Sequence, residues 1–139
     1  MTTTDFLVIG SGVAGLSFAL RAAEYGKVTI LCKSDPLISS SAKAQGGIAA
    51  VMDKNDTFEE HVADTLDAGA GLCNEAAVRT IVEEAPAAIE ELLNWGVDFD
   101  TEKDGEFDLG REGGHGKRRI LHSKDTTGLE ISTKLLRCV

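Results

Sequence analysis

Positive charge and long apolar runs are what this 139-residue sequence has least of. Its 14 lysines and arginines stand against 23 aspartates and glutamates, which leaves a formal net charge of −9. A surplus of this sign predicts binding neither to nucleic acid nor to an anionic membrane surface. No apolar run approaches the ~18 residues that a membrane-spanning helix requires, and no basic leader precedes the first apolar stretch. We therefore expect neither a membrane anchor nor a signal peptide.

Cysteine pairs and metal-ligand spacings are lacking too. The cysteines are odd in number, widely spaced and without a C-x-x-C pattern, and the histidines do not have the spacing of a metal site. We therefore expect reduced thiols, no disulfide, no metal and a cytoplasmic location. The residues concerned are Cys32, Cys73, Cys138, His61, His115 and His122.

What the sequence does contain is a dinucleotide fingerprint. An apolar strand pattern, Phe6–Ile9, leads directly into G-x-G-x-x-G and then a helical pattern. In that setting Gly10 permits the tight turn, Gly12 the approach of a diphosphate, and Gly15 close packing of helix on strand. The N–H groups and dipole at the helix start would bind the phosphates. The cofactor-binding residues predicted here are Gly10, Ser11, Gly12, Val13, Ala14 and Gly15. A glycine-rich turn without a ligand is the alternative.

The following residues complete a βαβ unit over residues 5–33. Apolar residues recur at helical spacing as far as Ala23, Gly26 stands where a C-cap glycine belongs, and Val28–Cys32 is typical of a second buried strand. After that strand, Lys33 occupies the place where an NAD-binding chain has an acidic residue. Lys33 therefore favours a different dinucleotide, or it is a solvated residue at a strand end.

Beyond residue 33 the sequence predicts mainly helices. A capping box at Thr57–Glu60 predicts the start of a helix that extends to about Ala68. Asn74 is expected to cap a second helix, which Pro86 interrupts or restarts and which ends at Trp95–Gly96. The later signals are short strands at 97–101 and 107–109 around a turn at Asp104–Gly105, a loop over 110–116, and a capping box at Thr127–Glu130 before a helix from Leu129.

Two parallel strands do not make a covered sheet, because parallel sheets need more strands and helices on both faces. The fold class predicted is therefore α/β, with a Rossmann-like βαβ unit followed by a mainly helical region. We expect this domain to be incomplete within residues 1–139.

Three further segments carry a resemblance to a known family. They are Ser39–Ala50, Asp67–Gly71 and Arg111–Leu121, the last of which begins Arg-Glu-Gly-Gly-His. With the fingerprint, they make the chain resemble the succinate dehydrogenase/fumarate reductase flavoproteins over essentially its whole length. The resemblance implies FAD as cofactor. It also implies that residues 1–139 are the N-terminal part of an FAD-binding domain, reaching into the start of a substrate-capping region.

The resemblance implies a position for FAD along the chain. Lys33, which this family shares, would lie near the adenosine ribose, and small residues further on would let backbone amides approach the flat flavin ring. A simple turn is the alternative for Gly46–Gly47. The flavin-side residues implied are Ser40, Ser41, Ala42, Lys43, Ala44, Gln45, Gly46 and Gly47. Respiratory members attach FAD to a histidine where this chain has Ser40, so FAD is expected to be non-covalent.

Within the family, the likeness is to members that oxidise L-aspartate to iminoaspartate for NAD biosynthesis. The residue matching Glu112 faces the substrate ammonium in those members, so we expect Glu112 to select aspartate over succinate by roughly 1–3 kcal/mol. A solvated charge cluster is the alternative. The basic run Lys117–Arg119 suits carboxylates or phosphates, but on a loop it is more typical of solvated residues. The family's proton-transferring arginine lies outside residues 1–139.

The partners implied are small molecules, with L-aspartate as substrate and oxygen or fumarate as electron acceptor. Quinolinate synthase is a candidate for the downstream enzyme. Two other functions stay open: a flavoenzyme specific for succinate or fumarate, and a non-catalytic FAD-binding fragment.

Overall fold

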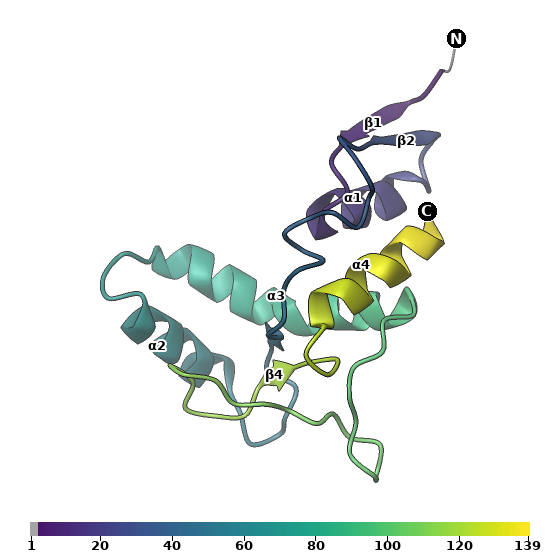
Figure 1. Cartoon of the computed structure of the whole chain (residues 1–139). Helices are drawn as coiled ribbons and strands as arrows, with labels where there is room; N and C mark the ends of the chain where they lie inside the picture. The colour runs from purple at the N-terminus through teal and green to yellow at the C-terminus, as the bar shows by residue number, and fades with distance from the viewer. Residues whose placement is uncertain (1–2) are drawn as a thin grey trace. The chain divides into compact units, whose positions relative to one another are not determined.

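The computed structural model describes residues 3–139, which form two compact units (Figure 1). The first unit holds the described residues up to Gly46 together with Asn94–Asp98 and Lys124–Val139. The second holds Gly47–Leu93 and Phe99–Ser123. None of the helices in the described part of the chain combines the length and apolar character that a bilayer span requires.

The first unit is built on a βαβ element. Strand β1 (Phe6–Ile9) pairs in parallel with β2 (Val28–Leu31), from Phe6 opposite Val28 to Ile9 opposite Leu31. Helix α1 (Val13–Ala22) connects them and buries Leu16, Ala19 and Ala22, and α4 (Thr127–Cys138) packs against α1. The predicted βαβ unit is therefore confirmed.

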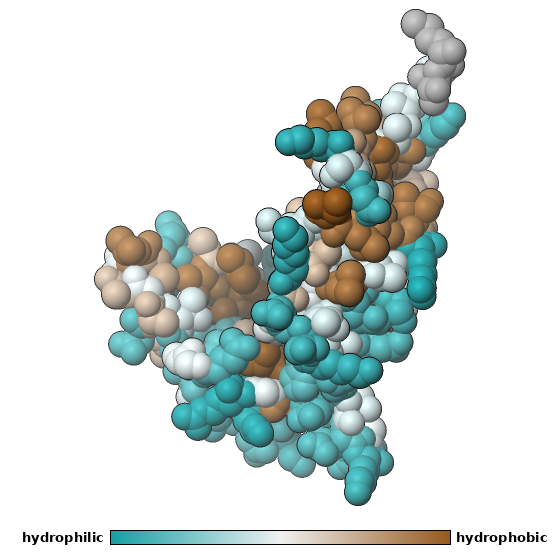
Figure 2. Space-filling model, in the orientation of Figure 1, coloured by the Kyte–Doolittle hydropathy of each residue, from teal (hydrophilic) through white to brown (hydrophobic). Residues whose placement is uncertain are grey.

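The two strands are less covered than their sequence predicted. Val8 is buried, but Leu7, Ile9 and Leu31 are 58%, 80% and 56% exposed. Figure 2 shows hydrophobic residues gathered on the part of the molecule that holds β1, β2 and α1. The prediction of buried strands is wrong for this face, because α1 packs against the face that holds Val8 and nothing described covers the opposite face.

Gly26 is not the C-cap of α1. The cap residue is Ala23, whose N–H bonds the carbonyl of Ala19, and the chain continues in turn for three more residues. A Cβ on Gly26 would lie 2.9 Å from Oδ2 of Asp5, the carboxylate oxygen that accepts the Lys27 N–H at 2.8 Å. Glycine is needed there for close approach to Asp5 rather than to end the helix.

The second unit contains α2 (Phe58–Ala68), most of α3 (Glu75–Asn94), and a two-stranded antiparallel pair of β3 (Ile48–Ala49) with β4 (Ile120–Leu121). Both predicted N-caps are confirmed. Thr57 Oγ1 accepts from the Glu60 N–H at 3.2 Å, and Asn74 Oδ1 accepts from Ala77 N–H at 3.0 Å. The β3–β4 pair was not predicted, because two-residue strands are too short to show periodicity.

Several predicted boundaries are wrong in this region. Helix α3 runs through Pro86 without a break, since Val82, Ile89 and Leu92 bury a continuous apolar side that outweighs one missing backbone hydrogen bond. The two strands expected at 97–101 and 107–109 reduce to a single bridge between Thr101 and Phe107.

Helix α4 begins two residues before Leu129, with Thr126 as its N-cap residue and no side-chain cap. The capping box predicted at Thr127–Glu130 is wrong, because the Glu130 carboxylate instead accepts from the backbone N–H of Asp98 at 3.3 Å and pairs with Lys134 at 3.2 Å.

Candidate functional site

The turn between β1 and α1 has the geometry that its glycines predict. Gly10 has φ +106°, in the left-handed region that favours glycine, and its N–H donates to the Leu31 carbonyl at 2.9 Å. A Cβ on Gly15 would collide with the Gly10 carbonyl oxygen and lie 3.4 Å from Val8 Cγ1. Gly15 therefore lets the first turn of α1 pack directly on the end of β1.

The N-terminus of α1 is suited to an anion. Gly12 is its N-cap residue and has no side chain of its own to cap the helix, and the first turn has no acidic residue. Val13 and Ala14 are exposed. The amide groups and positive dipole end of the helix therefore face outward with no competing carboxylate on the helix itself, an arrangement that fits the diphosphate of a dinucleotide.

Ser41 lies against this helix start although it is far away in the sequence. Its Oγ accepts a hydrogen bond from the Val13 N–H at 3.1 Å and lies 3.3 Å from the position that a Cβ on Gly12 would occupy. A side chain on Gly12 would crowd the serine. The structure thus brings the predicted diphosphate residues together with one residue of the predicted flavin-side segment.

The segment around Ser41 is a series of tight turns. The N–H of Ala42 donates to Ser39 Oγ at 3.1 Å, and the N–H groups of Lys43 and Ala44 donate to the carbonyls of Ser40 and Ser41 at 3.2 Å each. The exposed predicted cofactor residues from Lys33 onward are Lys33, Ser40, Lys43, Ala44, Gln45, Gly46 and Gly47.

Ser11 and Gly47 among the predicted cofactor residues have structural roles. Ser11 is buried, and its hydroxyl donates to the Pro36 carbonyl at 2.8 Å, which fixes the loop after β2 against the glycine turn. A Cβ on Gly47 would collide with the Leu121 carbonyl and with Ile120 Cγ2. Glycine at position 47 is thus required by the β3–β4 pairing in the second unit.

The second unit has a buried charge network at its centre. Arg119 is 0% exposed and donates through Nε and Nη2 to the two oxygens of Asp56, both at 2.8 Å, and through Nη1 to Asp64 Oδ2 at 2.8 Å. Burial by itself lowers the pKa of Arg119, but the hydrogen bonds and charges of Asp56 and Asp64 outweigh it and raise that pKa above its ordinary value. The expectation of a solvated basic run is wrong for Arg119.

This network anchors the loop that carries Glu112. Asp64 Oδ2 also accepts the Gly116 N–H at 2.6 Å, and this hydrogen bond, with Arg119, lowers the pKa of Asp64 against the effect of desolvation. At the base of the loop, the Arg119 N–H donates to the Gly110 carbonyl at 3.1 Å. Glu112 itself is exposed.

Two histidine rings lie beside the network. The ring centroids of His61 and His115 are 5.7 Å apart, and the Nδ1 atoms of both are buried with no hydrogen-bond partner among the described residues. Burial, followed by the charge of Arg119 and the nearness of His115, lowers the pKa of His61. His61 is therefore held in the neutral form at neutral pH.

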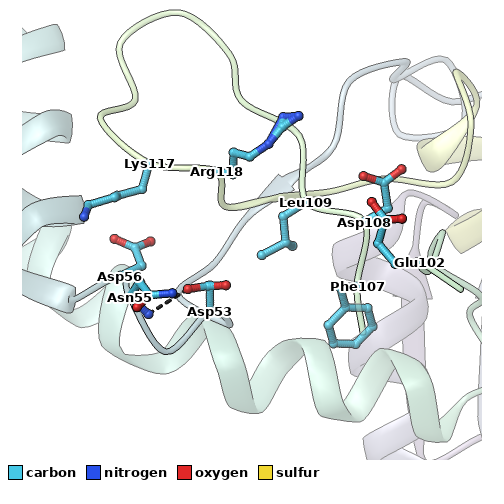
Figure 3. A pocket seen from close by; sticks show the side chains of 9 residues that line it. All are labelled: Asp53, Asn55, Asp56, Glu102, Phe107, Asp108, Leu109, Lys117 and Arg118. Atoms are coloured by element: carbon cyan, nitrogen blue, oxygen red, sulfur yellow. Dashed lines mark hydrogen bonds between the residues drawn. The ribbon is translucent and has the colours of Figure 1, made fainter. Parts of the chain in front are cut away.

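A pocket of about 350 Å³, lined mainly by charged residues, lies beside Lys117 and Arg118 (Figure 3). Lys117 and Arg118 point in different directions from the loop, so they do not converge on a single ligand position. Glu112 does not line this pocket. The lining residues are Asp53, Asn55, Asp56, Glu102, Phe107, Asp108, Leu109, Lys117 and Arg118.

Sequence reasoning missed the partners that hold both sites in place. Asp56 and Asp64 had no signal of their own, since single acidic residues just before a helix or within one are common. Gly128 was taken for part of a capping box, although its N–H donates to the Ala44 carbonyl at 3.0 Å.

Comparisons with known proteins identify the family. The family model described as FAD binding domain matches residues 5–137. L-aspartate oxidase of Vibrio cholerae is 52% identical over 136 residues, which is 94% of this chain and 25% of that protein. The chloroplastic L-aspartate oxidase of Oryza sativa subsp. japonica is 49% identical, over 97% of this chain and 21% of its own length.

A solved structure, the FrdA chain of E. coli quinol fumarate reductase, superposes with a TM-score of 0.90 at 32% identity. The match covers 97% of this chain and 24% of that one. The chain thus spans between a fifth and a quarter of the length of these two curated relatives and of the solved structure.

Proposed function

Because the chain belongs to the family of FAD binding domains, with FAD as its cofactor, we propose that it is the N-terminal FAD-binding part of an enzyme that oxidises L-aspartate to iminoaspartate. The observation that carries this proposal is the start of α1 behind the Gly10 turn, where no acidic residue lies in the first turn and Ser41 accepts the Val13 N–H. The high identity to L-aspartate oxidases supports the choice of substrate.

In this proposal the residues of the first unit bind and orient FAD. The amides of Gly12 and Ala14 face the diphosphate. Ser41 accepts from Val13, which leaves its hydroxyl hydrogen to donate to a phosphate oxygen. Lys33 lies toward the adenosine ribose, and Ser40–Gly46 along the flavin side. When bound, FAD supplies the chemistry by accepting a hydride from the substrate carbon.

We propose that FAD is held without a covalent bond, since the serine at position 40 cannot form a histidyl linkage. The tests use the full-length protein. Acid precipitation should release all of the yellow chromophore into the supernatant, and flavin left on the precipitated protein would contradict this part of the proposal.

Glu112 is proposed to select the substrate. Its exposed carboxylate sits on a loop that Asp64 and Arg119 hold at Gly116 and Gly110. A carboxylate so placed attracts the ammonium group of aspartate and repels a plain dicarboxylate, by roughly 1–3 kcal/mol when partly desolvated. Residues beyond position 139 would supply the remaining substrate contacts and the proton-transferring arginine.

The wider setting follows from the same proposal. The product would enter NAD biosynthesis, with quinolinate synthase as the candidate downstream enzyme, oxygen or fumarate as electron acceptor, and a cytoplasmic location. Assays of the full-length protein with L-aspartate and with succinate test the substrate, and aspartate turnover should dominate.

A second candidate is a flavoenzyme specific for succinate or fumarate, and the superposition on quinol fumarate reductase favours it. Preferential turnover of succinate would establish it in place of aspartate oxidation. Bound FAD without turnover of either substrate would indicate a non-catalytic FAD-binding protein.

A further inference from the structure

We propose that Gly128, at the start of α4, is a positioning residue for FAD, because it sets how closely the Ser41–Ala44 segment lies over the N-terminus of α1. This inference rests on the proposed place of the FAD diphosphate. All residues involved belong to the first unit.

The backbone of Gly128 lies so close to the Ser41–Ala44 segment that no side chain at position 128 would fit between them. It is buried, its N–H donates to the Ala44 carbonyl at 3.0 Å, and a Cβ on it would collide with the Ser41 carbonyl oxygen. The same Cβ would lie 2.9 Å from both the carbonyl oxygen and the Cβ of Ala44. Since two of these obstacles are backbone atoms, turning a side chain aside cannot relieve the collision.

The segment, rather than the helix, would have to move. Helix α4 is anchored by the buried side chains of Ile131 and Leu135 and by Lys134, whose ammonium lies 2.7 Å from Asp98. The Ser41–Ala44 segment is a partly exposed series of turns that the structure holds by single hydrogen bonds. A side chain at position 128 therefore displaces Ser41 and not α4.

Displacing Ser41 alters the proposed diphosphate site directly. Ser41 Oγ accepts the Val13 N–H at 3.1 Å, and it stands 3.3 Å from the place of a Cβ on Gly12. A retreat of the Ser41 backbone breaks the hydrogen bond to Val13 and removes the hydroxyl from the helix start. Gly128 thus acts on FAD through Ser41, without touching FAD itself.

The test compares FAD binding by the full-length protein and its Gly128→Ala variant. Apo-protein is titrated with FAD, the dissociation constant is read from flavin fluorescence, and the melting temperature of each apo-protein is measured. Alanine inside a helix is normally more favourable than glycine, so helix propensity alone predicts no loss. We expect the dissociation constant to rise about tenfold, or by about 1.4 kcal/mol. Leu129→Ala, on the next and exposed residue, is the matched control and should leave it unchanged.

A double-mutant cycle with Ser41→Ala separates positioning from general packing. Ser41→Ala alone should weaken FAD binding, and Gly128→Ala should add little in that background because both changes remove the same contact. The inference would be overturned if the two substitutions had additive effects on the dissociation constant together with an equal loss of apo-protein melting temperature. An unchanged dissociation constant in Gly128→Ala would overturn it as well. If Gly128→Ala does not fold, Ala44→Val crowds the same contact from the exposed loop, and its dissociation constant decides in the same way.

The proposed FAD site fails by a different result. An unchanged dissociation constant in Ser41→Ala would show that Ser41 does not lie on FAD. An effect of Ser41→Ala combined with none from Gly128→Ala or Ala44→Val would refute only the role of Gly128.

Discussion

Replacing Arg119 by methionine should release the loop that carries Glu112. Methionine has a similar length but no charge, so Asp56, whose side chain is 1% exposed, would be left as an unpaired buried carboxylate. Breaking a buried ion pair from one side costs about 3–5 kcal/mol. Asp64 adds less to this cost, because its side chain is 25% exposed and it keeps the Gly116 hydrogen bond.

Amide hydrogen exchange measures this cost where it arises. In the full-length protein, exchange of the amides over residues 110–121 should accelerate by about two to three and a half orders of magnitude, from ~1.4 kcal/mol per tenfold. Arg118→Met is the matched control, since Arg118 is the exposed neighbour on the same loop and surface changes stay within roughly 0.5 kcal/mol.

Removing the charge of Asp56 together with that of Arg119 should restore much of the lost protection against exchange. In the double variant Arg119→Met with Asp56→Asn, no uncompensated charge is buried, so exchange should slow again toward the wild-type rate. Equal exchange in Arg119→Met and Arg118→Met would refute the reasoning, because it would mean that the buried network does not hold the loop.

Two further predictions concern Glu112 and His61. Glu112→Gln in the full-length enzyme should lower aspartate oxidation about ten- to a hundredfold and retain or improve fumarate reduction, which involves no ammonium; a parallel fall in both rates would instead indicate a damaged loop. Because the pKa of His61 is lowered in the folded protein, the unfolded chain takes up a proton first, and stability should decline as pH falls below 6.5, the unperturbed pKa. The pKa of the Asp64 carboxyl is also lowered, but it affects stability only as pH falls below its ordinary value of 3.8. His61→Gln should therefore flatten the melting temperature between about pH 6.5 and 5, and an unchanged slope would rule out His61 as the cause.

The sequence by itself determined the βαβ element and its glycine turn. These depend on contacts between near neighbours: apolar spacing within α1, the left-handed turn at Gly10, and the fit of Gly15 against the Gly10 carbonyl. The caps at Thr57 and Asn74 were predictable for the same reason, since each bonds a backbone N–H three residues ahead.

Only the tertiary structure decided the roles of Arg119 and Gly128. Three basic residues stand in a row at 117–119, and nothing local distinguishes the one whose partners lie 63 and 55 positions away, at Asp56 and Asp64. The boundary of α4 depends in the same way on Asp98, which occupies the Glu130 carboxylate that a local capping box would use. The burial of a charge and the closeness of two backbones are properties of residues distant along the chain, so no pattern within a short window contains them.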